Sequence, residues 1–118
     1  MLGLVEEVRR PSDGELCGHV ERRGGHWCAL TVFGAVLGRH DRREDAVDRV
    51  LTEGLASLSE RWVLRHNDGG DAEVVCIQEA NATAVTVALG YYSMPGVPTR
   101  TIAAAQISSG EWEMSRSA

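Results

Sequence analysis

The apolar residues between Asp41 and Glu60 recur at intervals of three and four, and on both sides of this segment they alternate with polar residues. The first spacing is typical of a helix with one buried face, and the second is typical of half-buried strands. The buried helical face is predicted to consist of Ala46, Val47, Val50, Leu51, Leu55, Leu58 and Trp62. The order of these segments favours an α+β fold in which strands, one amphipathic helix and further strands follow one another.

The ends of this helix are also predicted by the sequence. Asp41 is expected to be the N-cap, because Glu44 follows at the spacing of a capping box. The helix is expected to run to about Glu60 and to pack on the sheet. Gly54 costs roughly 1 kcal/mol relative to alanine inside a helix, which is tolerable where the helix crosses the sheet closely.

Before the helix, the sequence predicts a three-stranded antiparallel meander. Two strand-like segments within residues 14–32 flank the run Arg22-Arg23-Gly24-Gly25, whose glycines supply the positive φ angles of a tight hairpin. A third strand is expected from Ala35 to Arg39. Residues 1–13 have no clear period and end in a turn signal, so we expect an extended lead-in or an edge strand there.

After the helix, alternation predicts a second antiparallel β segment, arranged as a small meander or a partial barrel. Its expected strands are Arg61 to His66, Glu73 to Gln78, Thr83 to Tyr91, Thr99 to Ala103 and Glu111 to Met114. The turn over residues 67–70 is too short to be a linker. Residues 1–118 are therefore expected to form a single compact domain, with the meander and helix over 14–60 and the β segment over 61–115.

Composition indicates the origin and the cellular compartment of the protein more than its activity. All 12 basic residues are arginine, which indicates a GC-rich bacterial or phage gene. The three cysteines, with no secretion signal and no apolar run of about 18 residues, favour a cytoplasmic protein with reduced thiols and no membrane partner. The net charge of -5 makes non-specific binding to nucleic acid less expected.

The segment CGHVERRGGHWC, residues 17–28, has a cysteine and a histidine on each side of the hairpin turn. With the turn centred on Arg23-Gly24, His19 is expected opposite Cys28, and Cys17 would lie roughly 13 Å from His26, too far for one metal ion. Only a turn at Arg22-Arg23 would bring all four together, and arginine does not suit that turn. We therefore expect no metal and no cofactor. These cysteines and histidines are expected to fill a semi-polar face of the hairpin, with cysteine behaving as a small hydrophobic residue. The alternative is a small thiol enzyme built on His19, His26 and Cys28.

Arginines are expected to gather at one end of the predicted meander, beside the helix N-terminus. The cluster consists of Arg22, Arg23, Arg39, Arg42 and Arg43. Guanidinium groups and helix N-terminal amides both suit phosphate oxygens, so the cluster is a candidate nucleic-acid site. The alternative is a solvated rim in which Glu21, Asp41, Glu44 and Asp45 neutralise the arginines.

A proline-bearing loop is the candidate partner-binding surface. It contains Tyr91, Tyr92, Met94 and Pro95. Tyrosine and methionine are enriched at protein interfaces, and proline reduces the ordering cost of binding. The alternative is a hairpin loop that folds back over the sheet with its tyrosines partly buried.

Two resemblances follow from particular residues. Within residues 14–60 the pattern is Gly18-x-Val20-x-Arg22-Arg23-Gly24-Gly25-x-Trp27-x-Ala29, then Gly34, Gly38, Asp41 and Arg43-Glu44-Asp45-Ala46. This pattern resembles the arm-type DNA-binding domain of phage tyrosine integrases, which implies three strands and a helix with the sheet against DNA. From Trp62 onward, a tryptophan-led strand, a hairpin, a Pro-Gly loop, an alanine-rich turn and a last strand with Trp112 resemble an SH3-like small barrel. Neither resemblance covers the whole chain.

Three functional hypotheses result. The leading one is a small non-enzymatic protein of a bacterium or phage that acts by binding another protein, as a regulator, inhibitor or adaptor, with self-association left open. The second is a nucleic-acid-binding accessory protein that uses the arginine cluster. The third is the thiol and histidine enzyme. No catalytic motif of a common reaction class occurs in the sequence.

Overall fold

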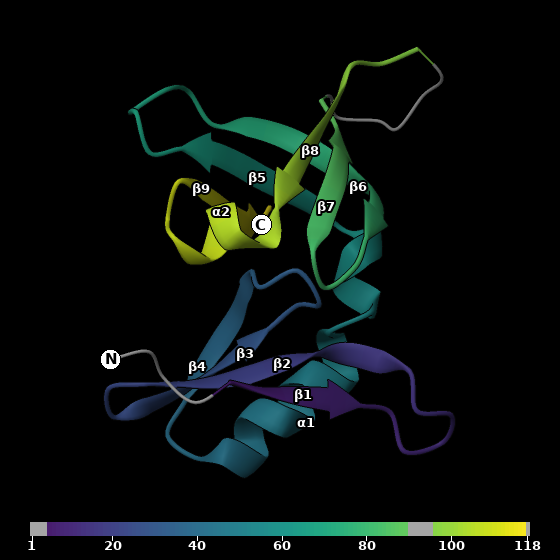
Figure 1. Ribbon diagram of the computed structural model, residues 1–118, viewed down its shortest axis with the longest axis vertical. Coiled ribbons are helices and arrows are strands. Elements are labelled where there is room, and N and C mark those ends of the chain that lie inside the picture. The colour runs from purple at the N-terminus through teal and green to yellow at the C-terminus, as the bar shows by residue number, and fades with distance from the viewer. Residues whose placement is uncertain (1–4, 90–95, 118) are drawn as a thin grey trace.

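The computed structural model describes residues 5–89 and 96–117, which form two antiparallel sheets. Sheet A contains β1 (Val5–Arg9), β2 (Leu16–Arg23), β3 (His26–Leu30) and β4 (Val36–His40). Helix α1 (Arg43–Glu53) and the 3-10 helix η1 (Ala56–Ser59) lead to sheet B. Sheet B contains β5 (Arg61–His66), β6 (Glu73–Ala80), β7 (Ala84–Ala88), β8 (Thr99–Ala103) and β9 (Trp112–Arg116), with the short helix α2 (Ala104–Ser108) before β9. In Figure 1, sheet A and α1 form the lower half of the molecule and sheet B forms the upper half.

Sheet A has four strands in the order β1-β2-β3-β4, so the prediction of three was wrong. The additional strand is β1, which lies in the region where we expected a lead-in or an edge strand, and it pairs with β2. Of its apolar residues Val8 is buried, whereas Val5 remains half-exposed. This strand therefore has little of the alternation by which a half-buried strand is recognised.

The β2–β3 hairpin also differs from the predicted register. Arg23 pairs with His26, so Gly24 and Gly25 alone form the turn, and Gly24 has a φ of 58°. His19 therefore lies opposite Leu30, and Cys28 lies opposite Glu21. The predicted His19–Cys28 pairing was wrong because the strand continues through both arginines, and only the glycines leave the ladder.

Helix α1 is amphipathic as predicted, but it is shorter. It ends at Glu53, and the chain tightens into η1 instead of continuing to Glu60. A Cβ on Gly54 would lie 3.2 Å from the carbonyl carbon of Cys17 and closer still to its oxygen, so the helix end rests directly on the β2 backbone. The predicted capping box is absent: the N-cap is Arg42, with no side-chain cap hydrogen bond.

Sheet B has the strand order β8-β7-β6-β5-β9. The sheet curls strongly. Its two edge strands come close together, as shown by the guanidinium of Arg100 on β8, which lies 4.9 Å from the ring of Trp112 on β9. The β6–β7 turn is held by Asn81, whose side-chain oxygen accepts hydrogen bonds from the backbone N–H groups of Thr83 and Ala84, each at 2.9 Å. The edge strands do not pair, so the sheet is not a closed barrel.

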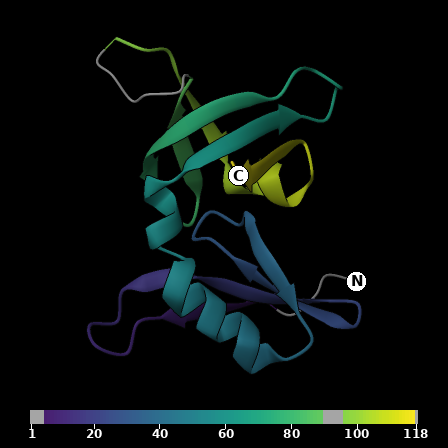
Figure 2. The same ribbon diagram turned by 180° about the vertical axis from the view of Figure 1, so that it is seen from behind.

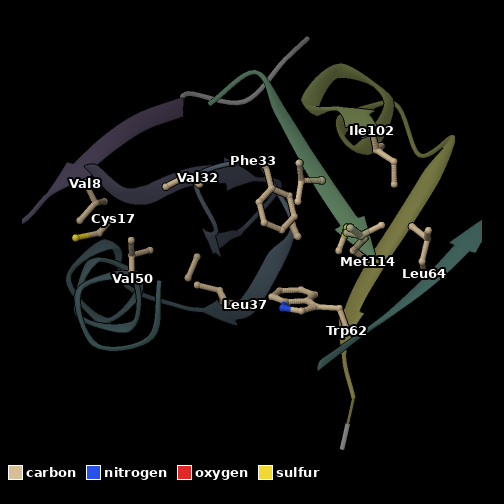
Figure 3. Packing of buried hydrophobic residues seen from close by; sticks show 14 of the residues in the cluster. Val8, Cys17, Val32, Phe33, Leu37, Val50, Trp62, Leu64, Ile102 and Met114 are labelled. Atoms are coloured by element: carbon tan, nitrogen blue, oxygen red, sulfur yellow. The ribbon is translucent and has the colours of Figure 1, made fainter. Parts of the chain in front are cut away.

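The β3–β4 turn joins the two sheets by inserting a phenylalanine into the core of sheet B (Figure 3). The rings of Phe33 and Trp62 meet edge to face with their centroids 5.8 Å apart, and both side chains are fully buried. Trp62 also donates a hydrogen bond to the Ser57 carbonyl at 2.9 Å. One hydrophobic cluster therefore runs from α1 and sheet A into sheet B.

A second junction ties β4 to β9 through a bulge at Leu37. The Leu37 carbonyl accepts hydrogen bonds from Arg49 of α1 at 3.1 Å and from Arg116 of β9 at 3.2 Å. Glu53 pairs with both arginines, with oxygen–nitrogen distances of 2.8 Å to Arg49 and 2.5 Å to Arg116. The hydrogen bond from Arg116 is the main reason that the pKa of Glu53 lies below its usual range. These contacts hold β9 beside the end of sheet A, as seen from behind in Figure 2.

Candidate functional site

A groove with a volume of about 930 Å³ lies between β4 and the α2–β9 segment. We name it the β4–β9 groove. Its lining residues come from β2, the β3–β4 turn, β4, α2 and β9: Glu21, Arg23, Gly34, Ala35, Val36, Arg39, Ile107, Ser108, Ser109, Gly110, Trp112, Glu113, Met114 and Ser115. Both strands that border it are edge strands of their sheets. The groove exists because the Phe33 turn and the Arg116 contact hold the sheets together at separate points.

The apolar lining of the groove is contributed by residues that are distant in the chain. Val36 is 38% exposed, which is unusual for a large apolar side chain in this protein. Ile107 and Trp112 are partly buried and pack against the core, and Met114 is a buried member of that core. An apolar surface of this kind between polar rims is typical of a site that takes up another chain.

The polar residues of the groove differ in whether they are already paired. Arg23 forms an ion pair with Glu21 on the same strand. The side chains of Arg39 and Glu113 make no ion pair or hydrogen bond with any other residue that the structure describes. One cation on the sheet A wall and one anion on the sheet B wall are therefore available to a ligand.

The predicted gathering of arginines is only partly realised. Arg39 and Arg42 line a second open cavity of about 480 Å³, together with His26, His40, Asp41 and Asp45. Arg23 faces the groove and pairs with Glu21. Arg22 pairs with Trp27, and both lie on the face of sheet A that is turned away from the groove. The cluster is therefore split between the two faces of the sheet.

The expected neutralising partners are also only partly correct. Arg43 turns to Glu6 of β1 and makes hydrogen bonds of 2.9 and 3.0 Å, and this arginine lowers the pKa of Glu6. Asp41 lies 3.4 Å from His26 instead of pairing with an arginine. Within residues 5–89 and 96–117, the side chains of Arg22, Arg39 and Arg42 have no ion-pair partner.

The cysteines and histidines of residues 17–28 do not converge. Cys28 is 1% exposed, whereas the His26 side chain is 58% exposed and faces Asp41. His19 directs Nδ1 towards the Thr31 carbonyl at 3.4 Å, and Cys17 lies in the core beside α1. In the part of the chain that the structure describes, no three histidine, cysteine, aspartate or glutamate residues are placed to hold a metal ion.

A third cavity, of about 320 Å³, lies on sheet B beside the β5–β6 loop. Its wall includes His66, which meets Trp112 edge to face at 4.5 Å and lies 3.2 Å from the carboxylate of Asp68. Asp68 also accepts a hydrogen bond from Gly70 at 2.8 Å, and these contacts lower its pKa. The polar groups of His66, Asp68 and Gly70 therefore bond mainly to one another and stabilise the β5–β6 loop.

The proline-bearing loop lies mostly outside the described residues, and this includes Tyr91, Tyr92, Met94 and Pro95. The residues that flank it are joined, since Leu89 donates a backbone hydrogen bond to Pro98 at 2.8 Å.

No model of a known protein family, no curated protein and no solved structure matches this chain. No helix within residues 5–89 or 96–117 has the length and apolarity needed to cross a membrane.

Sequence reasoning did not find the groove. Val36 and Met114 are far apart in the chain, and each reads as an ordinary strand residue. The only local signal was the pair of short strands at sequence positions 36–40 and 112–116, and nothing in their patterns indicates that both become sheet edges.

Proposed function

We propose that this chain is a small non-enzymatic binding protein whose partner is another protein that docks in the β4–β9 groove. The observation that supports this most strongly is the groove itself, which has a volume of about 930 Å³ and an exposed valine on its wall. Monomeric proteins rarely leave apolar surface in a wide concave site unless something covers it.

The thiol enzyme has less support as an activity. A nucleophilic cysteine needs access to substrate and a base within hydrogen-bond reach. Cys28 is almost fully buried, and no hydrogen bond joins its thiol to His19 or His26 among the described contacts. The groove offers a surface for binding and no group placed as a nucleophile with its base.

Val36→Arg tests the docking proposal. The substitution places a long charged side chain in the groove, and we expect partner capture from host lysate to fall at least tenfold. Leu51→Arg is the matched control, because Leu51 is also 38% exposed but lies on α1, away from the groove. Both variants should unfold at nearly the native temperature, since each site is already partly in solvent.

Bound proteins are quantified by mass spectrometry for the native chain and both variants. A partner that is lost only with Val36→Arg supports the groove. A partner that persists with Val36→Arg, or that is lost equally with Leu51→Arg, contradicts it.

A second candidate function is nucleic-acid binding at the second cavity. It is favoured by the unpaired side chains of Arg39 and Arg42 beside the N-terminus of α1, whose first turn has no side-chain cap. The integrase-like pattern is consistent with this, although β3 has no arginine and β4 has only Arg39. Asp41 and Asp45 in the same cavity weaken the attraction for phosphate.

Salt dependence separates this candidate from docking. If phosphate is bound, log affinity for a labelled DNA or RNA duplex falls linearly with log salt, and Arg42→Gln should reduce that slope by about 1. Arg65→Gln is the control, because Arg65 is an exposed arginine on sheet B, away from this cavity. Affinity that is absent, or a slope that both variants leave unchanged, rejects this candidate.

We also propose that sheet B has an SH3-like fold. Its tryptophan-led strand β5, the helix α2 before β9 and the position of β5 between β6 and β9 are consistent with an SH3-like partial barrel. Tyr91, Tyr92, Met94 and Pro95 remain a further proposed contact surface for a protein partner.

A further inference from the structure

The outer edge of β9 has backbone groups that sheet B does not use. Asn67 donates to the Glu111 carbonyl and Ser117 donates to the Arg61 carbonyl, each at 2.9 Å. In an antiparallel pair, hydrogen-bonded and non-hydrogen-bonded residue pairs alternate. By this alternation, Glu113 and Ser115, which pair with Arg65 and Val63, also bond to β5. Trp112 and Met114 belong to the non-hydrogen-bonded pairs, so they direct their N–H and C=O groups away from β5.

The opposite wall of the groove has the same property at one residue. Thr31 donates to the Ala35 carbonyl at 2.9 Å, so the next pair along the ladder, Leu30 and Val36, is a non-hydrogen-bonded pair. Because β4 is an edge strand, the N–H and C=O of Val36 point outwards from sheet A. Among the described residues no hydrogen bond is made to these outward groups, so the groove is bordered by free backbone donors and acceptors as well as by apolar side chains.

A strand edge of this kind is complementary to one type of ligand. An extended peptide can add to it as a further strand, with main-chain hydrogen bonds that supply affinity and side-chain contacts that supply specificity. A helix cannot satisfy the same row of backbone groups, because its own backbone groups are already paired, whereas any strand-like segment of a partner can.

The charges of the groove select among extended peptides. Arg23 is neutralised by Glu21, so Arg39 is the unpaired cation on the sheet A wall among the described residues. Glu113 on the sheet B wall disfavours an acidic side chain at that side. A carboxylate on the side of the peptide that faces β4 would pair with Arg39.

We infer that the groove binds an extended segment of a partner protein, which adds to the free edge of β9 as a sixth strand of sheet B and pairs a carboxylate with Arg39. This inference rests on the proposed docking function and adds the conformation and chemistry of the docked segment.

The experiment uses the full chain and a displayed library of random peptides of about nine residues, which span roughly 30 Å when extended. Selected peptides are synthesised, and amide hydrogen exchange of the protein is measured with and without peptide. We expect the amides of Trp112 and Met114 to become protected by at least tenfold, while those of Glu113 and Ser115, already bonded to β5, change little. Unchanged exchange at Trp112 and Met114 overturns strand addition.

Backbone methylation of the peptide gives a second, independent readout. Methylating the amide nitrogens that face β9 removes donors at every other residue, so alternate positions should each weaken binding about tenfold and the positions between them much less. Equal losses along the whole peptide overturn the inference, and so does a library that yields no binder.

Arginine variants test the charge. We expect Arg39→Gln to weaken binding of an acidic selected peptide about tenfold. Arg22→Gln should leave it unchanged, because Arg22 is also exposed and unpaired among the described residues but lies on the other face of sheet A. Equal effects of both substitutions overturn the carboxylate assignment.

The two proposals fail in different ways. If Val36→Arg abolishes peptide binding while Trp112 and Met114 stay unprotected, docking in the groove stands and strand addition falls. If the peptides bind Val36→Arg as tightly as the native chain, the groove itself is not the docking site.

Discussion

Trp62→Ala is expected to lower the free energy of unfolding by about 3–5 kcal/mol, the largest effect of any single substitution considered for this chain. The indole is fully buried, packs edge to face on Phe33 and donates a hydrogen bond to Ser57. Its removal leaves a cavity at the junction of the two sheets, and the Ser57 carbonyl loses one of its two donors, because the Glu60 N–H still bonds it at 3.1 Å. Equilibrium unfolding in urea, followed by far-UV circular dichroism, measures the change.

The same titration shows whether the two sheets unfold together. Because one hydrophobic cluster spans both, a single transition is expected for the native chain and for the variant. Leu51→Ala is the control, since this exposed leucine lies outside the junction and should cost well under about 1 kcal/mol. Two separate transitions, or a loss from Trp62→Ala as small as the control, would show that the Phe33–Trp62 contact does not join the halves.

Gly54→Ala is expected to destabilise the protein by about 1–3 kcal/mol, although alanine is usually the better residue in a helical conformation. Gly54 has φ and ψ of -53° and -59°, which alanine adopts without strain. The added methyl would overlap the Cys17 carbonyl, which is backbone and cannot rotate away. Helix α1 would have to lift from β2, and the loss of packing outweighs the gain of about 1 kcal/mol in helix propensity.

Gly25→Ala provides the comparison for this glycine. A Cβ at position 25 meets no atom within 4 Å, and its φ does not lie in the left-handed range. Thermal unfolding should therefore show a lower midpoint for Gly54→Ala and a nearly unchanged one for Gly25→Ala. A Gly54→Ala variant as stable as the native chain would mean that the close approach at Cys17 relaxes without cost.

The candidate site was less predictable than the fold, and particular residues show why. The hairpin, the helix start and the strand before it indicated correctly that Arg39 and Arg42 lie at one end of sheet A. The division of the five arginines between two faces depends on the hairpin register, which the strong turn preference of Gly24 and Gly25 decided. Arg43 pairs with Glu6 on β1. The sequence of this strand has too little alternation of apolar and polar residues to predict that pairing.

The length of α1 shows a similar limit. The helical spacing of apolar residues continues through Leu55, Leu58 and Trp62, so local pattern alone favours a longer helix. In the structure α1 ends at Glu53 where Gly54 lies against Cys17, the chain tightens into η1, and Trp62 is buried as a strand residue. A contact between residues 17 and 54 has no signature in the local sequence.

By itself, the sequence determined the alternation of strands, one amphipathic helix and further strands, because hydrophobic period and turn residues act over neighbouring positions. Only the tertiary structure decided which strands became edges, how Phe33 reached Trp62, and that Val36 and Met114 would face one groove. These features depend on packing between segments distant in the chain. Such packing is chosen by the shape and burial of the whole core, and no short stretch of residues encodes it.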